Sequence, residues 1–172
     1  MFLKICNVKL FLPGVQTTIV EASSRYREDV ERGNCGGLVI VGGVNFGRGA
    51  PRDWATKGPL SLGVRVVMAV SFDENYLSNL VQSGMLPLEI SRKVWEQLKG
   101  DELLNFDIKD RDGQELKASE AITVEIVKKD KEGKDELSKL EAKLRLDNAY
   151  QIKLFRCGGV IRDMLRKLNI SA

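Results

Sequence analysis

The most informative segment of the chain, residues 45–59, reads Asn45-Phe46-Gly47-Arg48-Gly49-Ala50-Pro51-Arg52-Asp53-Trp54-Ala55-Thr56-Lys57-Gly58-Pro59. It follows the apolar run 38–41, which has the length of a buried strand. Pro51 suits the first position of a helix that reaches about Leu62 and ends at Gly63. The segment is therefore predicted to be a glycine-rich loop between a buried strand and the N-terminus of a helix.

Such a loop is a candidate anion site, because backbone N–H groups and the helix dipole both favour negative charge there. A guanidinium can bind a carboxylate or phosphate through two hydrogen bonds. We therefore name as candidate anion-binding or substrate-binding residues Gly47, Arg48, Gly49 and Arg52. The alternative is that the glycines serve a tight crossover and the arginines are solvated. The loop lacks the third glycine of a dinucleotide fingerprint, and the sequence has no P-loop.

On either side of this loop, strand and helix patterns alternate in the first half of the chain, and antiparallel strands with polar turns follow in the second half. The predicted strands are residues 2–10, 38–41, 64–70, 85–90, 103–109, 122–128 and 137–146, with turns at 111–113 and 131–133. The predicted helices are residues 24–32, 51–62, 72–83, 92–98 and 160–168. We expect the apolar stripe of the last helix to belong to the core: Val160, Ile161, Met164, Leu165 and Leu168.

Composition limits the class of protein. The 172 residues, 43% hydrophobic and 30% charged, suit one soluble globular domain spanning residues 1–172. The chain has no histidine, so the commonest general base and metal ligand is absent. Three widely spaced cysteines favour a reduced compartment, with no metal-ligand spacing. We expect a cytoplasmic location, with mitochondria as the alternative, and no membrane insertion, because the apolar runs are short.

Residues 45–59 resemble the signature of the swivel domain of the aconitase and iron regulatory protein family, in its Arg-Asp-Trp-Ala form. The likeness continues along nearly the whole chain, through residues 62–67, 78–80, 84–89, 158–161 and 165–168. The resemblance implies an α/β fold, a swivelling three-layer β/β/α domain of the aconitase C-terminal or isopropylmalate dehydratase small-subunit type. It also implies that the family's 4Fe-4S cluster would belong to a partner, with no cofactor or metal in this chain.

The sequence departs from that family at the loop, which normally reads Gly-x-Gly-Ser-Ser-Arg. In the family, the first serine is the catalytic base, and the second serine and the arginine bind substrate carboxylate. Ala50 and Pro51 replace the serines here, and Arg52 remains. Because an alanine methyl cannot exchange a proton, we expect no catalytic residue in this chain. A second departure is Glu74-Asn75-Tyr76 in place of an Arg-Ile-His triplet, which we interpret as change on a helix surface. The alternative is that contacts with the family's cluster-bearing domains are no longer needed.

Three functions are compatible with these observations. We expect first a catalytically degenerate, free-standing swivel-domain protein that acts as a binding or structural component of a larger assembly. The alternative is an accessory small subunit of a two-chain hydro-lyase, completing the active site of an iron–sulfur large subunit. The third is weak RNA binding of the iron regulatory type, with Arg52, Asp53 and Trp54 as contact candidates. Against the third, Trp54 is expected to be a buried packing residue.

Overall fold

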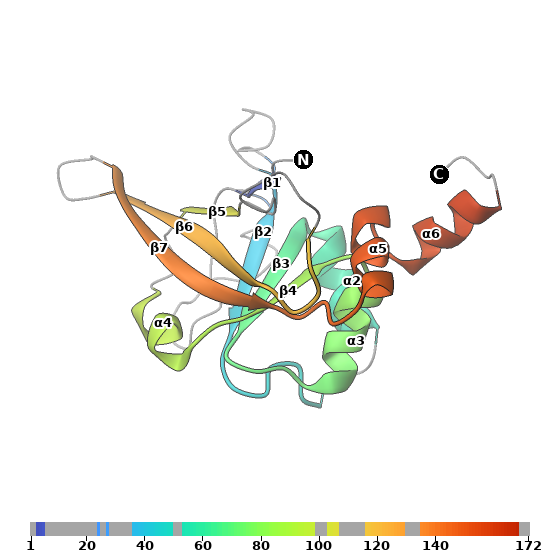
Figure 1. Cartoon of the computed structure of the whole chain (residues 1–172), viewed down its shortest axis with the longest axis horizontal. Helices are drawn as coiled ribbons and strands as arrows, with labels where there is room; N and C mark the ends of the chain where they lie inside the picture. Colours follow the sequence, from blue (N-terminus) through green and yellow to red (C-terminus); the bar gives the residue numbers. More distant parts are fainter. Residues whose placement is uncertain are drawn as a thin grey trace.

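The computed structural model describes residues 3–5, 24, 27, 36–49, 53–98, 103–106, 116–129 and 135–168. Within these ranges the chain forms an α/β domain with one seven-stranded mixed sheet in the order β1-β5-β6-β7-β4-β3-β2. Figure 1 shows helices α2, α3 and α5 along one side of the sheet and the long β6–β7 ribbon curving over the other. The predicted α/β fold class with three β/β/α layers is confirmed.

The parallel half of the sheet positions the loop at residues 43–49. Strands β2 (Leu38–Gly42), β3 (Val64–Ala69) and β4 (Leu86–Glu89) run parallel in adjacent positions. Helices α2 (Trp54–Ser61) and α3 (Glu74–Gln82) provide the two crossovers. The carboxyl ends of these strands meet at one edge, which is where open parallel sheets commonly place their ligands.

The antiparallel half follows a short helix, α4 (Arg92–Gln97), whose first turn is capped by the Ser91 hydroxyl accepting from the Val94 N–H. Strands β5 (Leu103–Phe106), β6 (Ala121–Lys129) and β7 (Asp135–Leu144) pair antiparallel. Strand β1 (Leu3–Ile5) pairs with the outer side of β5. These strands confirm the expected pattern; the predicted turns at 111–113 and 131–133 lie outside the described residues.

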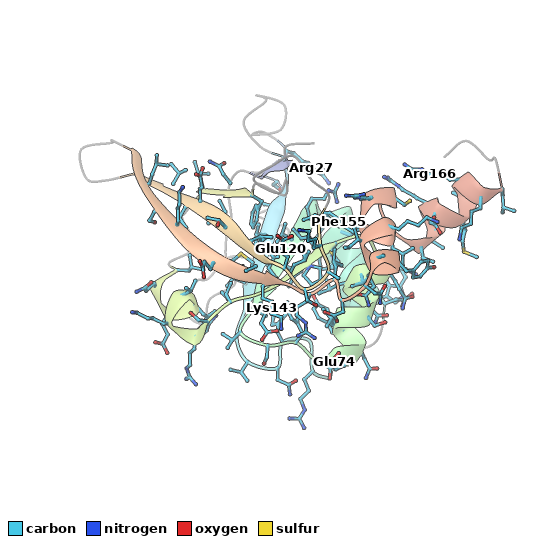
Figure 2. The ribbon with its side chains drawn as sticks, in the orientation of Figure 1. Arg27, Glu74, Glu120, Lys143, Phe155 and Arg166 are labelled. Atoms are coloured by element: carbon cyan, nitrogen blue, oxygen red, sulfur yellow. The ribbon has the colours of Figure 1, made fainter. Side chains whose placement is uncertain are left out.

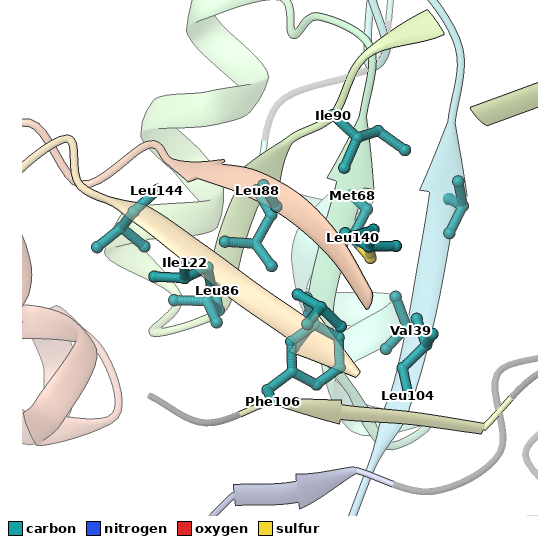
Figure 3. Close-up of a cluster of buried hydrophobic side chains, with 14 of the residues drawn as sticks. Val39, Met68, Leu86, Leu88, Ile90, Leu104, Phe106, Ile122, Leu140 and Leu144 are labelled. Carbon is teal, nitrogen blue, oxygen red and sulfur yellow. The ribbon is translucent and has the colours of Figure 1, made fainter. Parts of the chain in front are cut away.

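Two apolar clusters hold the layers together, one on each face of the parallel strands. The larger lies between the parallel and antiparallel halves, and Figure 3 shows its centre. Its members include Val39, Met68, Leu86, Leu88, Leu104, Phe106, Ile122, Leu140 and Leu144. The smaller cluster joins the opposite face to α3 and includes Ile40, Val67, Ala69, Phe72, Leu77 and Leu80. Alternating strand residues thus enter two different cores, which explains the continuous apolar runs at 38–41 and 64–70.

The C-terminal region differs from the expectation. Helix α5 (Ala149–Cys157) was not predicted; the Asn148 side chain caps its start by accepting from the Gln151 N–H, and it ends at Gly158 in the left-handed conformation. The predicted last helix forms as α6 (Val160–Lys167). The prediction that its apolar stripe belongs to the core holds only in part, because Val160 packs against the larger apolar cluster and Leu165 is half-buried. It is wrong for the other three residues. Ile161, Met164 and Leu168 are exposed, and the buried residue of α6 is Asp163.

The remaining predicted elements agree with the structure where it describes them. Of the predicted helix 24–32, residues 24 and 27 are described and both are helical. Of the strand predicted at 2–10, residues 3–5 form β1. Among the described helices, none combines the length and apolarity needed to cross a lipid bilayer.

Candidate functional site

The candidate site lies at the carboxyl edge of the parallel strands, where the loop at 43–49 meets the segment that joins β3 to α3. Five hydrogen bonds hold the two segments together, two of them from the Val70 and Ser71 N–H groups to the Gly43 carbonyl, at 3.2 and 3.5 Å. The backbone N–H groups of Asn45 and Phe46 donate to the hydroxyl and carbonyl of Ser71, at 2.7 and 2.9 Å. The Asp73 N–H donates in return to the Phe46 carbonyl, at 2.9 Å. The strand ends therefore fix the position of the glycine turn.

Gly47 is required at this turn for two reasons. Its φ is +90°, a conformation that side chains disfavour. A Cβ at Gly47 would also lie 2.2 Å from Cγ of Tyr76. Tyr76 in turn packs edge-on against Phe46, with ring centroids 5.6 Å apart at 84°. The Tyr76 ring, packed against Phe46, therefore occupies the space that a side chain at position 47 would need.

An open pocket of about 810 Å³ lies between this turn and α3. Its described lining is Gly47, Gly49, Asp53, Asp73, Asn75, Tyr76, Ser78 and Asn79. Asp73 is engaged as the cap of α3, because its carboxylate accepts from the N–H groups of Asn75 and Tyr76. Burial raises the pKa of Tyr76 to about 12, so its hydroxyl stays protonated at neutral pH. The described residues of the pocket wall are mostly polar. They offer hydrogen-bonding groups, and none of them is a lysine or an arginine.

The N-terminal end of helix α2 forms part of the site, since its N-cap residue Asp53 lines the pocket. Asp53 already has helical dihedral angles, and its carboxylate pairs with Lys57 at 2.5 Å. The hydrogen bond from Lys57 and its charge lower the pKa of Asp53 from 3.8. Beneath it, the buried Thr56 hydroxyl donates to the Asp53 carbonyl and shares a hydrogen bond with Ser83 at the end of α3. This second contact fixes α2 against α3.

The residues predicted from the sequence are only partly gathered here. Gly47, Gly49 and Asp53 line the pocket, and Arg48 is exposed beside them. Ala50 and Arg52 lie outside the described residues. The expectation that Trp54 is buried is wrong: 74% of its surface is exposed.

Tyr76 is the residue that sequence analysis undervalued. The triplet Glu74-Asn75-Tyr76 was interpreted as change on a helix surface, which holds for Glu74 and Asn75, both exposed. Tyr76 is instead buried in the cluster between sheet and helices. The sequence did contain a signal: Tyr76 lies one residue before Leu77 and four before Leu80. This spacing places all three residues on the apolar side of α3.

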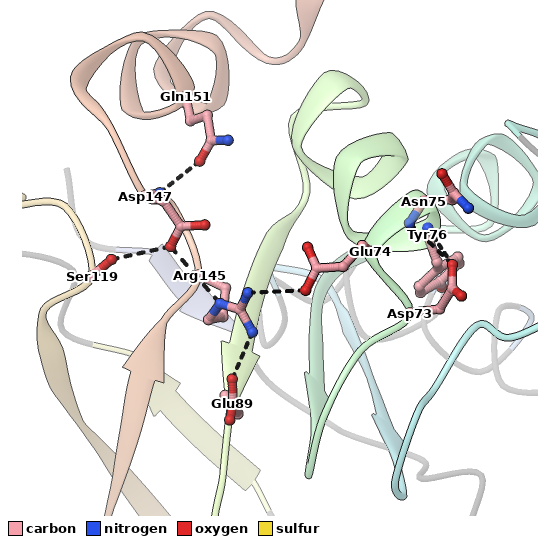
Figure 4. A network of polar contacts seen from close by, with 9 residues as sticks. All are labelled: Asp73, Glu74, Asn75, Tyr76, Glu89, Ser119, Arg145, Asp147 and Gln151. Atoms are coloured by element: carbon pink, nitrogen blue, oxygen red, sulfur yellow. Dashed lines mark hydrogen bonds and ion pairs between the residues drawn. The ribbon is translucent and has the colours of Figure 1, made fainter.

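A second polar cluster adjoins the start of α3. Arg145, just after β7, forms ion pairs with Glu89 at 2.7 Å, Glu74 at 3.5 Å and Asp147 at 3.8 Å, as Figure 4 shows. Burial alone would lower the pKa of Arg145, but the hydrogen bond to Glu89 and the charges of Asp147, Glu89 and Glu74 raise it. The cluster joins the parallel and antiparallel halves at the same edge as the pocket.

Within the ranges that the structure describes, no three His, Cys, Asp or Glu side chains gather as a metal site requires. Cys157, at the end of α5, is a free cysteine. Its thiol lies near the carboxylate of Asp163, and it is far from the glycine turn in sequence.

Comparison with known proteins identifies the domain. Residues 12–93 match the model of the aconitase C-terminal domain. The chain is 32% identical to aconitate hydratase A of Legionella pneumophila over 168 residues, 95% of this chain. Residues 12–93 belong to the aconitase C-terminal domain family. Aconitate hydratase A of Pseudomonas aeruginosa is 36% identical over 92% of the chain. The aconitase C-terminal domain described here spans about a sixth of these relatives, 17% in both cases.

A solved structure shares the fold of this aconitase C-terminal domain. It is titled 3-isopropylmalate dehydratase (leuD) and comes from Methanocaldococcus jannaschii. The TM-score is 0.57 at 20% sequence identity, and the match covers 98% of this chain and 96% of that one. The similarity of fold therefore extends over nearly the full length of both chains.

Proposed function

We propose that this chain is the small swivel component of a two-chain hydro-lyase and completes the active site of a larger, cluster-bearing partner. The observation that supports the proposal best is the mutual coverage with the leuD chain, 98% and 96%, on a common fold. The curated aconitase relatives give the reaction class but are about six times longer than the region they share with this chain. A partner chain would supply the remainder.

The chain's own contribution to such a site is carboxylate binding. The glycine turn sits at the carboxyl edge of the parallel strands, next to the first turn of α2, whose dipole favours an anion. Arg48 is exposed there, and Arg52 follows two residues after Ala50 in the sequence. Because Ala50 cannot exchange a proton, we assign the base to the partner. The degenerate role expected from the sequence, as a binding or structural component of a larger assembly, differs from this proposal in having no turnover and in requiring no hydro-lyase partner.

The test is reconstitution. The probe is Legionella pneumophila aconitate hydratase A from which the region matching this chain has been deleted. Sedimentation velocity should show a complex between the two proteins, and cis-aconitate hydration should exceed that of either component. Arg48→Met should weaken substrate binding, whereas Lys93→Met on α4 should not. Absence of a complex with this probe would overturn the proposal; a complex without turnover would establish the binding-only role.

RNA contact is a second candidate, because Trp54 is exposed rather than buried. An exposed indole at the start of α2 can stack on an unpaired base, and Arg48 can contact phosphate. Binding to a hairpin RNA should weaken steeply as salt rises. Trp54→Ala should reduce the binding constant by about 5- to 150-fold, which corresponds to a stacking energy of about 1–3 kcal/mol. Equal binding by wild type and Trp54→Ala would exclude this contact.

A further inference from the structure

The pocket beside the glycine turn continues along α3. The turn lines one part of it, where the proposed function places a substrate carboxylate beside the exposed Arg48. Another part of the wall belongs to the first two turns of α3 and consists of the polar residues Asn75, Ser78 and Asn79. Their spacing places these three side chains on one side of the helix, over about 6 Å of its length. Because the turn lies against Tyr76, an acid bound there extends along α3 and brings its far end to this polar wall.

The side chains of this wall keep hydrogen-bonding capacity for a ligand. The Ser78 hydroxyl accepts from the Gln82 side chain at 3.1 Å, so its own proton can still be donated. Asp73 lies at the start of α3 and accepts both of its bonds from the backbone on Oδ1, so within the described residues Oδ2 is left as an acceptor. Asn75 and Asn79 each carry an amide that both donates and accepts. The wall therefore suits a group that can do both.

A second carboxylate on the ligand is disfavoured at this wall. Asp53 and Asp73 both line the pocket, and the hydrogen bond and charge of Lys57 lower the pKa of Asp53, so its carboxyl is ionised at pH 7. The cations nearby are already paired, Lys57 with Asp53 and Arg145 with Glu74 at the start of α3. In Figure 2, Glu74 marks this end of the helix. A negatively charged far end would thus meet carboxylates of its own sign, which is unfavourable.

An alkyl far end fits poorly as well, because it displaces water from the Asn75 and Asn79 amides without replacing the lost hydrogen bonds. An uncharged hydroxyl or amide avoids both costs, since it can donate to Asp73 and accept from Ser78. We propose that the site takes acids whose far end carries an uncharged hydroxyl or amide, and that Asn79 and its neighbours on α3 determine this specificity. The inference rests on the carboxylate binding that the proposed function assigns to the turn. Further carboxylates of a substrate would then be held by the partner chain.

The experiment titrates three acids that differ at the far end into the full chain, labelled with ¹⁵N. At the same position, 4-hydroxybutyrate carries a hydroxyl, pentanoate a methyl and glutarate a carboxylate. Chemical shifts of the Gly47 and Gly49 amides report binding at the turn, and the side-chain amides of Asn75 and Asn79 report contact with α3. We expect 4-hydroxybutyrate to bind about 2- to 12-fold more tightly than pentanoate, the effect of one net hydrogen bond. Glutarate should bind more weakly than 4-hydroxybutyrate by at least a similar factor.

Two variants connect the preference to the wall. Asn79→Leu replaces the amide with an alkyl group of similar size, so 4-hydroxybutyrate should lose its advantage over pentanoate. Asp53→Asn removes a carboxylate from the pocket, so the affinity for glutarate should rise more than the affinity for pentanoate. Gln97→Leu makes the matched change at an exposed amide on α4 and should leave the order of the three acids unchanged. Circular dichroism checks the fold of each variant.

The outcomes separate this inference from the proposed function. If none of the acids shifts the Gly47 and Gly49 amides, the turn binds no carboxylate, and both the proposed role of the turn and the inference fail. If the acids bind there but pentanoate or glutarate binds at least as tightly as 4-hydroxybutyrate, the role of the turn stands and the inference alone is overturned. A preference for 4-hydroxybutyrate that survives Asn79→Leu would overturn the assignment of specificity to α3.

Discussion

Gly47 and Gly49 occupy the same turn but meet different neighbours. Both have positive φ, +90° and +76°. A Cβ at Gly47 would overlap Tyr76, whereas a Cβ at Gly49 would meet nothing within 4 Å. The pair therefore separates the cost of backbone conformation from the cost of close packing.

We expect Gly49→Ala to lower the free energy of unfolding by about 1–2 kcal/mol, the cost of a left-handed conformation. Gly47→Ala should lower it by about 2–5 kcal/mol, because overlap with Tyr76 adds to the same cost. Urea denaturation of both variants measures the difference. Equal losses would mean that the Tyr76 ring yields without penalty.

Asp163 makes a pH-dependent contribution to stability. The hydrogen bonds from Lys167 and Lys153 lower its pKa from the ordinary 3.8. A carboxylate with a lowered folded-state pKa stabilises the fold above the unfolded pKa and loses that effect as pH falls through the folded value. Asp163→Asn should therefore be less stable than wild type at pH 7.

The two proteins should become equally stable as the pH falls below 3.8 and through the lowered pKa of Asp163. Urea midpoints between pH 7 and pH 2 test this convergence. Asp147→Asn, at an exposed carboxylate, is the control and should show a smaller difference at pH 7. A constant gap between wild type and Asp163→Asn at all pH values would contradict the assigned pairs.

At the scale of elements, the position of α2 depends on its contact with α3. Thr56 is buried at the start of α2, and its hydroxyl meets both the Asp53 carbonyl and the Ser83 hydroxyl. Since Ser83 closes α3, this one side chain links the two crossover helices on the same face of the sheet. The glycine turn precedes α2 and is thereby held against α3.

Thr56→Val keeps the shape of the side chain and removes its hydroxyl, so we expect a loss of about 1–2 kcal/mol. Ser61→Ala is the matched control, because its hydroxyl donates to the Gly58 carbonyl at the exposed end of the same helix. That change should cost less than about 0.5 kcal/mol. Guanidinium denaturation gives both values, and a Thr56→Val loss no larger than that of Ser61→Ala would show that the hydroxyl does not join the helices.

For the whole molecule, we expect no hydro-lyase activity from the chain alone. Two observations support this expectation: the loop sequence and the length of the relatives. Ala50 replaces a serine of the family motif, and this chain corresponds to 17% of aconitate hydratase A. Restoring the hydroxyls with Ala50→Ser and Pro51→Ser should therefore give no cis-aconitate hydration by the chain alone. A coupled assay measures it, and turnover by the unaided variant would show that no partner is needed.

How far the sequence predicts this molecule is clearest from individual elements. The strands at 38–41 and 64–70 were predictable because both of their faces enter a core, which produces uninterrupted apolar runs. Helix α5 was missed, although Asn148 and Gly158 mark its ends, because its few buried residues leave a weak periodic pattern. The glycine turn was located from its motif, but its reliance on Tyr76 could not be inferred from residues almost thirty positions apart.

The sequence by itself determined the fold class and the family, since strand and helix periodicity and the Arg-Asp-Trp-Ala segment are local properties of the chain. It also determined the absence of a serine at position 50. Only the tertiary structure decided which apolar residues are buried. Trp54 and the apolar side of α6 were expected in the core, yet Trp54, Ile161, Met164 and Leu168 are exposed. The ion pair of Asp163 with Lys153 of α5 and the contact of Thr56 with Ser83 determine instead how α6 and α2 pack.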